Sequence, residues 1–159
     1  MNYILKLNNI YLLVVTVCIF TLLSAVYIEY ILNVRPCILC KYQRVPYIIA
    51  IFICFFGYFN LENKFWIYLI IVTFLFSSML SGYHVGIENN IFKEFSGCTS
   101  NNTNIINKDE LLKVLKDSQP NCKDVAFKLM GFSLATFNLL LSIIIVILSI
   151  KTIQNEKNR

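Results

Sequence analysis

Long apolar blocks separated by polar segments dominate the pattern of positions along this chain. Four blocks, each 17 to 22 residues long, contain no charged side chain; they span residues 7–28, 45–61, 65–83 and 129–150. A helix needs about 20 apolar residues to cross the hydrocarbon core of a bilayer, which is roughly 30 Å thick. The pattern therefore predicts four transmembrane helices, at about residues 8–28, 38–59, 65–83 and 129–150.

The connections between the blocks complete the predicted architecture. Residues 60–64 form a tight turn, whereas residues 29–37 and 84–128 form the other two connections. Pro46 lies inside the second predicted helix and should kink it, because proline removes a backbone hydrogen bond. The first block is longer than the apolar region of a signal peptide, so it is predicted to be a retained helix. The fold class is an all-α membrane protein, with residues 1–159 forming one four-helix bundle domain.

A short amphipathic helix is predicted within the second loop on the extracytoplasmic side, residues 84–128. Asn107 is suited to cap its start, Glu110 occupies the third helical position, and leucines follow at helical spacing. This helix fits either the membrane surface or packing on the bundle, and the sequence does not separate the two. Acidic and basic residues balance along this loop, so Glu88 is interpreted as a solvated loop charge.

Composition agrees with a membrane protein. The 159 residues are 57% hydrophobic and 14% charged, whereas soluble domains carry about 25% charged residues. The net charge of +5 is scattered along the chain, which gives no indication of nucleic-acid binding.

The positions of the six cysteines relate the two longer connections. Cys18 and Cys54 fall within apolar blocks, where a thiol usually behaves as a small hydrophobe. The other four lie outside the apolar cores, in two pairs: Cys37 and Cys40, and Cys98 and Cys122. With four membrane spans, these two connections must emerge on the same side. Disulfides persist in oxidising compartments, which places this side outside the cytoplasm.

The distribution of basic residues points the other way. The cysteine-bearing side holds nine Lys and Arg, including Arg35, Lys41 and Arg44, against five on the side of the termini. The positive-inside rule would therefore place the cysteines in the cytoplasm. We give this count less weight, because most of these cations lie in the charge-balanced loop and two of the others lie in the cysteine motif.

The Cys37-Ile-Leu-Cys40 motif sits at the predicted start of the second helix. A helix N-terminus carries positive partial charge and stabilises a thiolate. Pro36 suits the first helical turn, and Arg44 lies four residues after Cys40, on the same helix face. This pattern predicts a reactive sulfur beside a fixed cation. The alternatives are a structural disulfide in a capping turn and an arginine that extends to the membrane surface.

The segment Pro36-Cys-Ile-Leu-Cys-Lys-Tyr-Gln-Arg44 resembles the P-C-x-L-C-x-Y-x-R signature of the disulfide bond formation protein B (DsbB) family. The four spans, the two cysteine pairs and Tyr83-His84 agree with that family. The resemblance implies a bacterial inner-membrane enzyme with cytoplasmic termini and periplasmic cysteine loops. It would reoxidise a periplasmic thioredoxin-fold protein (DsbA-like) and pass the electrons to ubiquinone or menaquinone, without a metal, supporting disulfide formation in secreted proteins.

The resemblance also implies a role for each cysteine outside the spans. Cys98 would be attacked by the reduced partner protein and form a mixed disulfide with it. Cys122 would be the disulfide mate of Cys98 and would exchange with Cys37. Cys40 would lie nearest the quinone ring.

On the quinone side, the resemblance implies that Arg44 contacts a ring oxygen and that His84 lies near the ring. A cation would stabilise the developing oxyanion, and a histidine could hydrogen-bond the ring or relay a proton. A structural hydrogen bond is the alternative for His84. Gln43 departs from members of the family that carry Glu at this position, and Pro46 is a second local difference.

Other classes of protein remain open at this point. Cys37, Cys40, Cys98 and Cys122 could bind zinc as a Cys₄ set, but zinc sites of this kind usually use two short-spaced pairs. A tetraspan protein whose disulfides only staple its loops would have unreactive cysteines and no quinone. Four-helix reductases of the vitamin K epoxide type use a similar motif, but the Arg44 spacing and the short first connection favour DsbB.

Overall fold

The computed structural model describes residues 7–61, 63–93, 122–123, 128–129 and 132–157. Its long helices are α1 (Leu7–Tyr30), α3 (Val45–Phe59), α4 (Phe65–Glu88) and α6 (Leu134–Lys157), with the short helix α2 (Ile38–Tyr42) before α3. The candidate membrane spans within them are Asn8–Tyr30, Ile38–Phe59, Phe65–Glu88 and Leu134–Asn155. The predicted four-span α-helical architecture is therefore confirmed.

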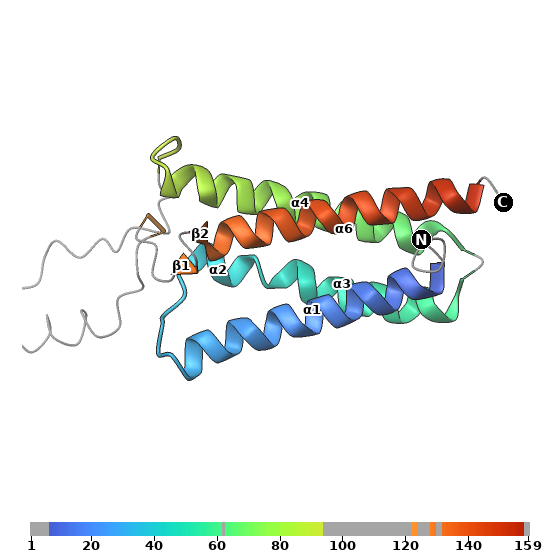
Figure 1. Ribbon diagram of the computed structural model, residues 1–159, viewed down its shortest axis with the longest axis horizontal. Helices are drawn as coiled ribbons and strands as arrows, with labels where there is room; N and C mark the ends of the chain where they lie inside the picture. Colours follow the sequence, from blue (N-terminus) through green and yellow to red (C-terminus); the bar gives the residue numbers. More distant parts are fainter. Residues whose placement is uncertain (1–6, 62, 94–121, 124–127, 130–131, 158–159) are drawn as a thin grey trace, which may run out of the picture.

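The helices lie side by side as an elongated bundle (Figure 1). Helix α1 packs against α3, α3 against α4, α4 against α6, and α6 against α1, so each long helix contacts two neighbours around the bundle. Large apolar side chains such as Phe20, Phe52 and Met79 are exposed on the outside, as expected for a surface that faces lipid. The end of α1, helix α2, the end of α4 and the start of α6 lie together at one end of the bundle, opposite the C-terminal end of α6 (Figure 1).

The second span is broken between α2 and α3 at Gln43 and Arg44. Pro46 explains the break, since it has no N–H for the carbonyl of Tyr42, the last residue of α2, and its ring would clash with that carbonyl. The Arg44 N–H instead bonds the Lys41 carbonyl at 3.1 Å. The distortion expected at Pro46 is thus present as a helix break rather than as a gentle kink.

Three helix ends differ from the prediction by five residues or more, and one of them is the end of α6, at Lys157 rather than at 150. The fourth helix begins at Leu134, not at 129, because Ser133 caps it: its Oγ accepts a hydrogen bond from the Thr136 N–H at 3.2 Å. Before the cap, strand β1 (Lys128–Leu129) pairs antiparallel with β2 (Phe132–Ser133). The third helix continues beyond residue 83 to Glu88, so His84 and Glu88 lie on α4 rather than in a loop.

Polar bonds in the interior tie α3, α4 and α6 together below the cysteine end. Asn138 on α6 accepts a hydrogen bond from the Tyr47 hydroxyl of α3 and donates to Ser81 Oγ on α4 at 2.7 Å. Ser77 and Ser142 hydrogen-bond between α4 and α6 at 3.0 Å. Buried polar groups that are paired in this way fix the relative positions of the helices. The predicted amphipathic helix near Asn107 lies outside the described residues.

Candidate active site

Cys37 and Cys40 are placed by the start of α2. Cys37 is the N-cap, and its Sγ accepts a hydrogen bond from the Cys40 N–H at 3.3 Å. Pro36 therefore lies just before the helix, whereas the sequence had suggested a place in its first turn. The two Sγ atoms are 3.1 Å apart, whereas a disulfide bond is about 2.05 Å long. Both cysteines are free thiols, the first buried and the second partly exposed.

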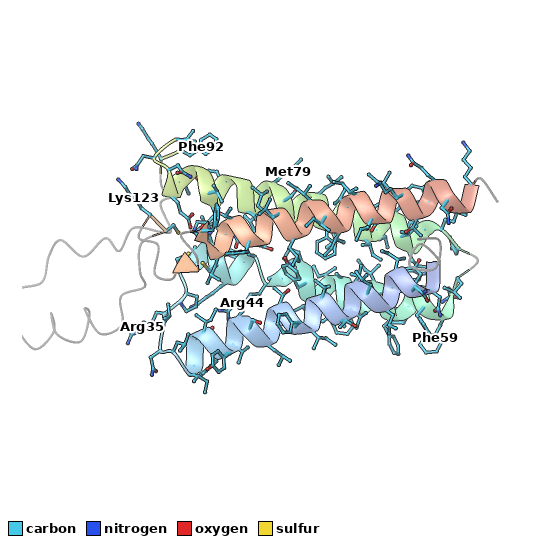
Figure 2. All side chains as sticks on the ribbon, viewed as in Figure 1. Arg35, Arg44, Phe59, Met79, Phe92 and Lys123 are labelled. Carbon is cyan, nitrogen blue, oxygen red and sulfur yellow. The ribbon has the colours of Figure 1, made fainter. Side chains whose placement is uncertain are left out.

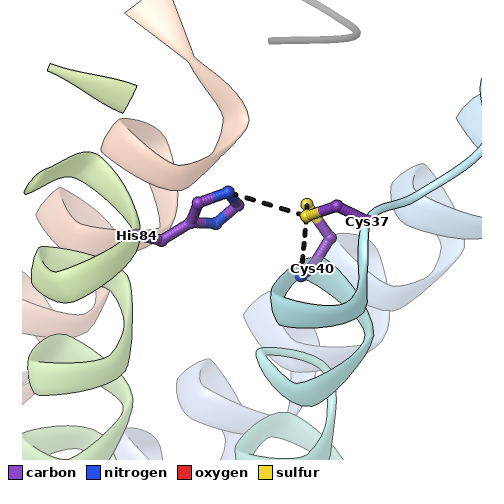
Figure 3. A group of neighbouring side chains, drawn as sticks. All are labelled: Cys37, Cys40 and His84. Atoms are coloured by element: carbon purple, nitrogen blue, oxygen red, sulfur yellow. Dashed lines mark hydrogen bonds between the residues drawn. The ribbon is translucent and has the colours of Figure 1, made fainter. Parts of the chain in front are cut away.

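His84 reaches this dithiol from α4, across the end of the bundle. Its Nε2 lies 3.6 Å from Cys37 Sγ (Figure 3), and its Nδ1 lies 3.1 Å from Gln43 Nε2. On the same helix, Glu88 Oε1 is 3.7 Å from His84 Nε2. A backbone hydrogen bond also joins His84 to Cys122. The imidazole is therefore buried at the centre of a polar cluster that draws residues from α2, α4 and the second connection.

These contacts stabilise the thiolate form of Cys37. The hydrogen bond with the Cys40 thiol lowers the pKa of Cys37 far below the value of an ordinary thiol, although burial opposes this effect. Hydrogen bonds from His84 and the Cys40 N–H, together with the charge of His84, lower the Cys37 pKa further. Among the thiols of the motif, Cys37 is thus prepared to act as a nucleophile.

Cys122 lies beside this dithiol in space. It is buried in one apolar cluster with Cys37, Leu39 and Ile87, and it is disulfide-bonded. The expectation that the two cysteine connections meet on one side is therefore met for Cys37 and Cys122. Cys98, the expected mate of Cys122, lies outside the described residues.

A cavity of about 890 Å³ opens beside the dithiol, between α1, the α2–α3 break, α4 and α6. Apolar side chains of α1 and α6, such as Leu23 and Phe137, form most of its wall. Cys40, Arg44 and His84 all line it, so the structure brings together the three residues for which the family resemblance implied a place beside a cofactor.

Arg44 is held at this cavity by a salt bridge to Glu29 of α1. Their side chains are 26% and 24% exposed, so the pair is only partly shielded from solvent. Figure 2 places Arg44 at the same end of the bundle as Arg35 and Lys123, far from Phe59 at the other end. This end of the molecule therefore combines free thiols, cations and an apolar cavity.

Comparison with known proteins identifies the family. The family described as "Disulfide bond formation protein DsbB" matches residues 7–152. The chain belongs to the DsbB family. A protein of Rickettsia prowazekii (strain Madrid E), named "Uncharacterized protein RP370", is 35% identical over 156 residues, covering 92% of this chain and 88% of its own length. Membership in the DsbB family makes this chain a multi-pass membrane oxidoreductase of disulfide bond formation.

Two sets of residues in this DsbB-family chain could be considered as zinc ligands. The Cys₄ set needs the sulfur of Cys122, which is already in a disulfide. The donor atoms of Cys37, Cys40 and His84 lie within 4.8 Å of one another, a spacing that a metal ion could also bridge. Structural zinc sites take four protein ligands in a closed set, whereas this cluster offers three among the described residues.

Two carboxylates at the site were missed by sequence reasoning. Glu88 was interpreted as a solvated loop charge, but its side chain is 10% exposed and faces His84. The spacing of four residues between them would have indicated the contact, had α4 been extended to Glu88. No sequence signal links Glu29 to Arg44, because the pair depends on how α1 packs against the α2–α3 break.

Proposed function

We propose that this protein oxidises a reduced thioredoxin-fold dithiol protein (DsbA-like) and transfers the electrons to a membrane quinone. The observation that carries the proposal is the cavity, where Cys40, Arg44 and His84 border a mostly apolar space. A thiol, a fixed cation and a histidine beside an apolar cavity between membrane helices match what a thiol–quinone reaction needs.

The residues present fit a quinone. The cavity volume of about 890 Å³ lies within the range of about 300–1,000 Å³ that is usual for small-molecule sites. Its apolar walls suit an isoprenoid-bearing ring that partitions into lipid, and its polar residues gather at the dithiol. A quinone bound there would supply an acceptor for two electrons and two protons. Arg44 would stabilise negative charge on a ring oxygen, and His84 would hold a proton beside Cys37.

Electrons reach this site by thiol–disulfide exchange. The thiolate of the partner protein attacks Cys98, and Cys122 leaves as a thiolate. Cys122 then attacks Cys37 in a Cys37–Cys40 disulfide, and Cys40 leaves as a thiolate beside the cavity. The second thiolate of the partner then attacks its own sulfur in the mixed disulfide, which releases the oxidised partner and a Cys98 thiolate. Cys98 attacks Cys122 and re-forms their disulfide, Cys37 is released, and two electrons rest on the Cys37–Cys40 pair. The shared burial of Cys37 and Cys122 supports this route.

The same route favours one membrane orientation. Exchange with a secreted oxidase requires the cysteine end of the bundle to face the periplasm, with both termini in the cytoplasm. The protein would then reside in the bacterial inner membrane. Cys37, Cys40 and Cys122 lie together at one end of the bundle, and the sequence places Cys98 in the same connection as Cys122, which supports this orientation over the one favoured by counting basic residues.

The test combines both half-reactions in lipid nanodiscs. The full chain is mixed with a reduced DsbA-like protein and either ubiquinone-1 or a short-chain menaquinone, and thiol loss and quinone absorbance are followed together. Cys40→Ser should abolish quinone reduction, and Cys98→Ser should abolish partner oxidation. Cys18→Ser, which changes a buried thiol in α1, is the control and should retain turnover. If Cys40→Ser and Cys98→Ser both oxidise the partner as fast as the parent does, the proposal is wrong.

A further inference from the structure

Glu88 is a nearly buried carboxylate that none of the exchange steps uses. It lies on the last turn of α4 with its side chain 10% exposed, and its Oε1 is 3.7 Å from His84 Nε2. Removing a carboxylate from water costs free energy unless a partner compensates it. The contact with His84 supplies such a partner.

Besides the backbone hydrogen bond to Cys122, His84 has different side-chain neighbours at its two ring nitrogens. Nδ1 faces the side-chain amide of Gln43 at 3.1 Å, which fixes the orientation of the ring. Nε2 faces both Cys37 Sγ at 3.6 Å and Glu88 Oε1 at 3.7 Å. A proton on Nε2 therefore lies between a sulfur and a carboxylate. Cys37, His84 and Glu88 are thus arranged like the nucleophile, the base and the residue that orients the base in a catalytic triad.

We propose that Glu88 is a positioning residue that acts through His84, holding the imidazole so that it takes the Cys37 proton and keeps it beside the thiolate. In this step the S–H bond of Cys37 breaks and an N–H bond forms at His84 Nε2, while the Gln43 amide rotates to offer its oxygen to the Nδ1–H. The sulfur becomes negative and the ring positive, while the Glu88 carboxylate compensates the ring. The inference rests on the proposed relay through Cys37, but it involves neither the quinone nor the partner protein.

The charge of Glu88 also acts directly on the sulfur, with the opposite sign. A carboxylate repels a thiolate, so through space alone Glu88 would raise the pKa of Cys37. Acting through His84, it favours the imidazolium and lowers the Cys37 pKa. The other ionisable groups that line the cavity are Cys40, Arg35, Arg44, Glu29, Tyr27 and Tyr47, and they stay the same when only Glu88 is changed. The sign of the change on neutralising Glu88 therefore separates the two roles.

The experiment measures the pH profile of Cys37 alkylation in the full-length reduced protein in nanodiscs, without quinone. Iodoacetamide is the probe, and fragment mass spectrometry assigns the label to Cys37. Glu88→Gln should raise the midpoint by about 0.5–1 pH unit, which makes alkylation roughly three- to tenfold slower at pH values below the midpoint. Glu88→Asp should restore part of the parent profile. Glu29→Gln removes a carboxylate that faces Arg44 and should not raise the midpoint.

The same substitution in a His84→Ala variant shows whether Glu88 acts through His84. In His84→Ala, the addition of Glu88→Gln should leave the Cys37 midpoint unchanged or lower it, because only repulsion through space remains. Cys18, which is fully buried in α1, reports on folding by staying unlabelled in each variant. A lowered or unchanged midpoint in Glu88→Gln alone overturns the inference. An equal rise in the His84→Ala background overturns it as well. Neither result would depend on whether a quinone is the electron acceptor.

Discussion

Replacing Glu29 with glutamine should weaken quinone binding by releasing Arg44 from the cavity wall. An arginine carries five N–H donors in a planar fork, and the salt bridge to Glu29 uses only part of the fork. The remainder is free to meet a ring oxygen, as long as the guanidinium stays in place. Without the carboxylate, the flexible side chain can turn toward the membrane surface.

The exposure of the pair sets the expected magnitude. Surface ion pairs contribute about 0.2–1 kcal/mol, whereas breaking a fully buried pair costs about 3–5 kcal/mol. Side chains that are 26% and 24% exposed fall between these limits, nearer the surface value. A loss of about 1–2 kcal/mol corresponds to a rise of roughly five- to thirtyfold in the KM for quinone.

The assay is steady-state oxidation of a reduced DsbA-like protein at varied ubiquinone-1 concentrations in nanodiscs. A second measurement follows a single exchange with the partner in the absence of quinone, and it should not change, because that exchange is between cysteines and does not use the contact of Arg44 with a quinone. Arg44→Lys is the matched control: it keeps the charge but loses the fork, and should raise the KM in the same way. An unchanged or lower KM in Glu29→Gln would refute the idea that this carboxylate holds Arg44 for the ligand.

Two further predictions follow from the contacts of single residues. Because its pKa is lowered, Cys37 should be alkylated at nearly the same rate as the pH falls from 8 to 6, whereas the alkylation rate of an ordinary thiol falls roughly seventyfold over that range. An equally large fall in the rate at Cys37 would contradict the lowered pKa. The buried Cys18 should stay unlabelled throughout. Tyr47→Phe removes the hydroxyl that donates to Asn138 and should lower the free energy of unfolding by about 1–3 kcal/mol in detergent titrations, since a partly buried acceptor loses its donor. The exposed Tyr58 gives the control variant Tyr58→Phe, which should be neutral. Equal stability of both variants would argue against this bond between α3 and α6.

The sequence predicts the four spans well, because the absence of charge over a membrane thickness is a strong signal. It predicts their ends poorly, because hydropathy does not report where a helix is capped. Residues 129–133 are largely apolar, yet α6 starts only after the cap at Ser133. In the same way, the chain becomes polar at His84, although α4 continues to Glu88. The helix ends there because the next turn includes Asn90, whose backbone is in the left-handed region (φ 60°).

The part of the site that could be predicted from the sequence is the part whose residues are close together in the chain. The spacing of Cys37, Cys40 and Arg44 lies within one stretch, and the packing leaves these residues together. Their charged partners come from elsewhere, and the break at Pro46 determines which ones they meet. Gln43 and Arg44 lie in that break, and they turn to different helices: the amide reaches His84 on α4, while the guanidinium reaches α1. Although position 43 is a neutral Gln, two carboxylates from α1 and α4 still border the cavity. The acid–base character of the site is therefore set by the packing of neighbouring helices around the broken span as much as by the cysteine motif itself.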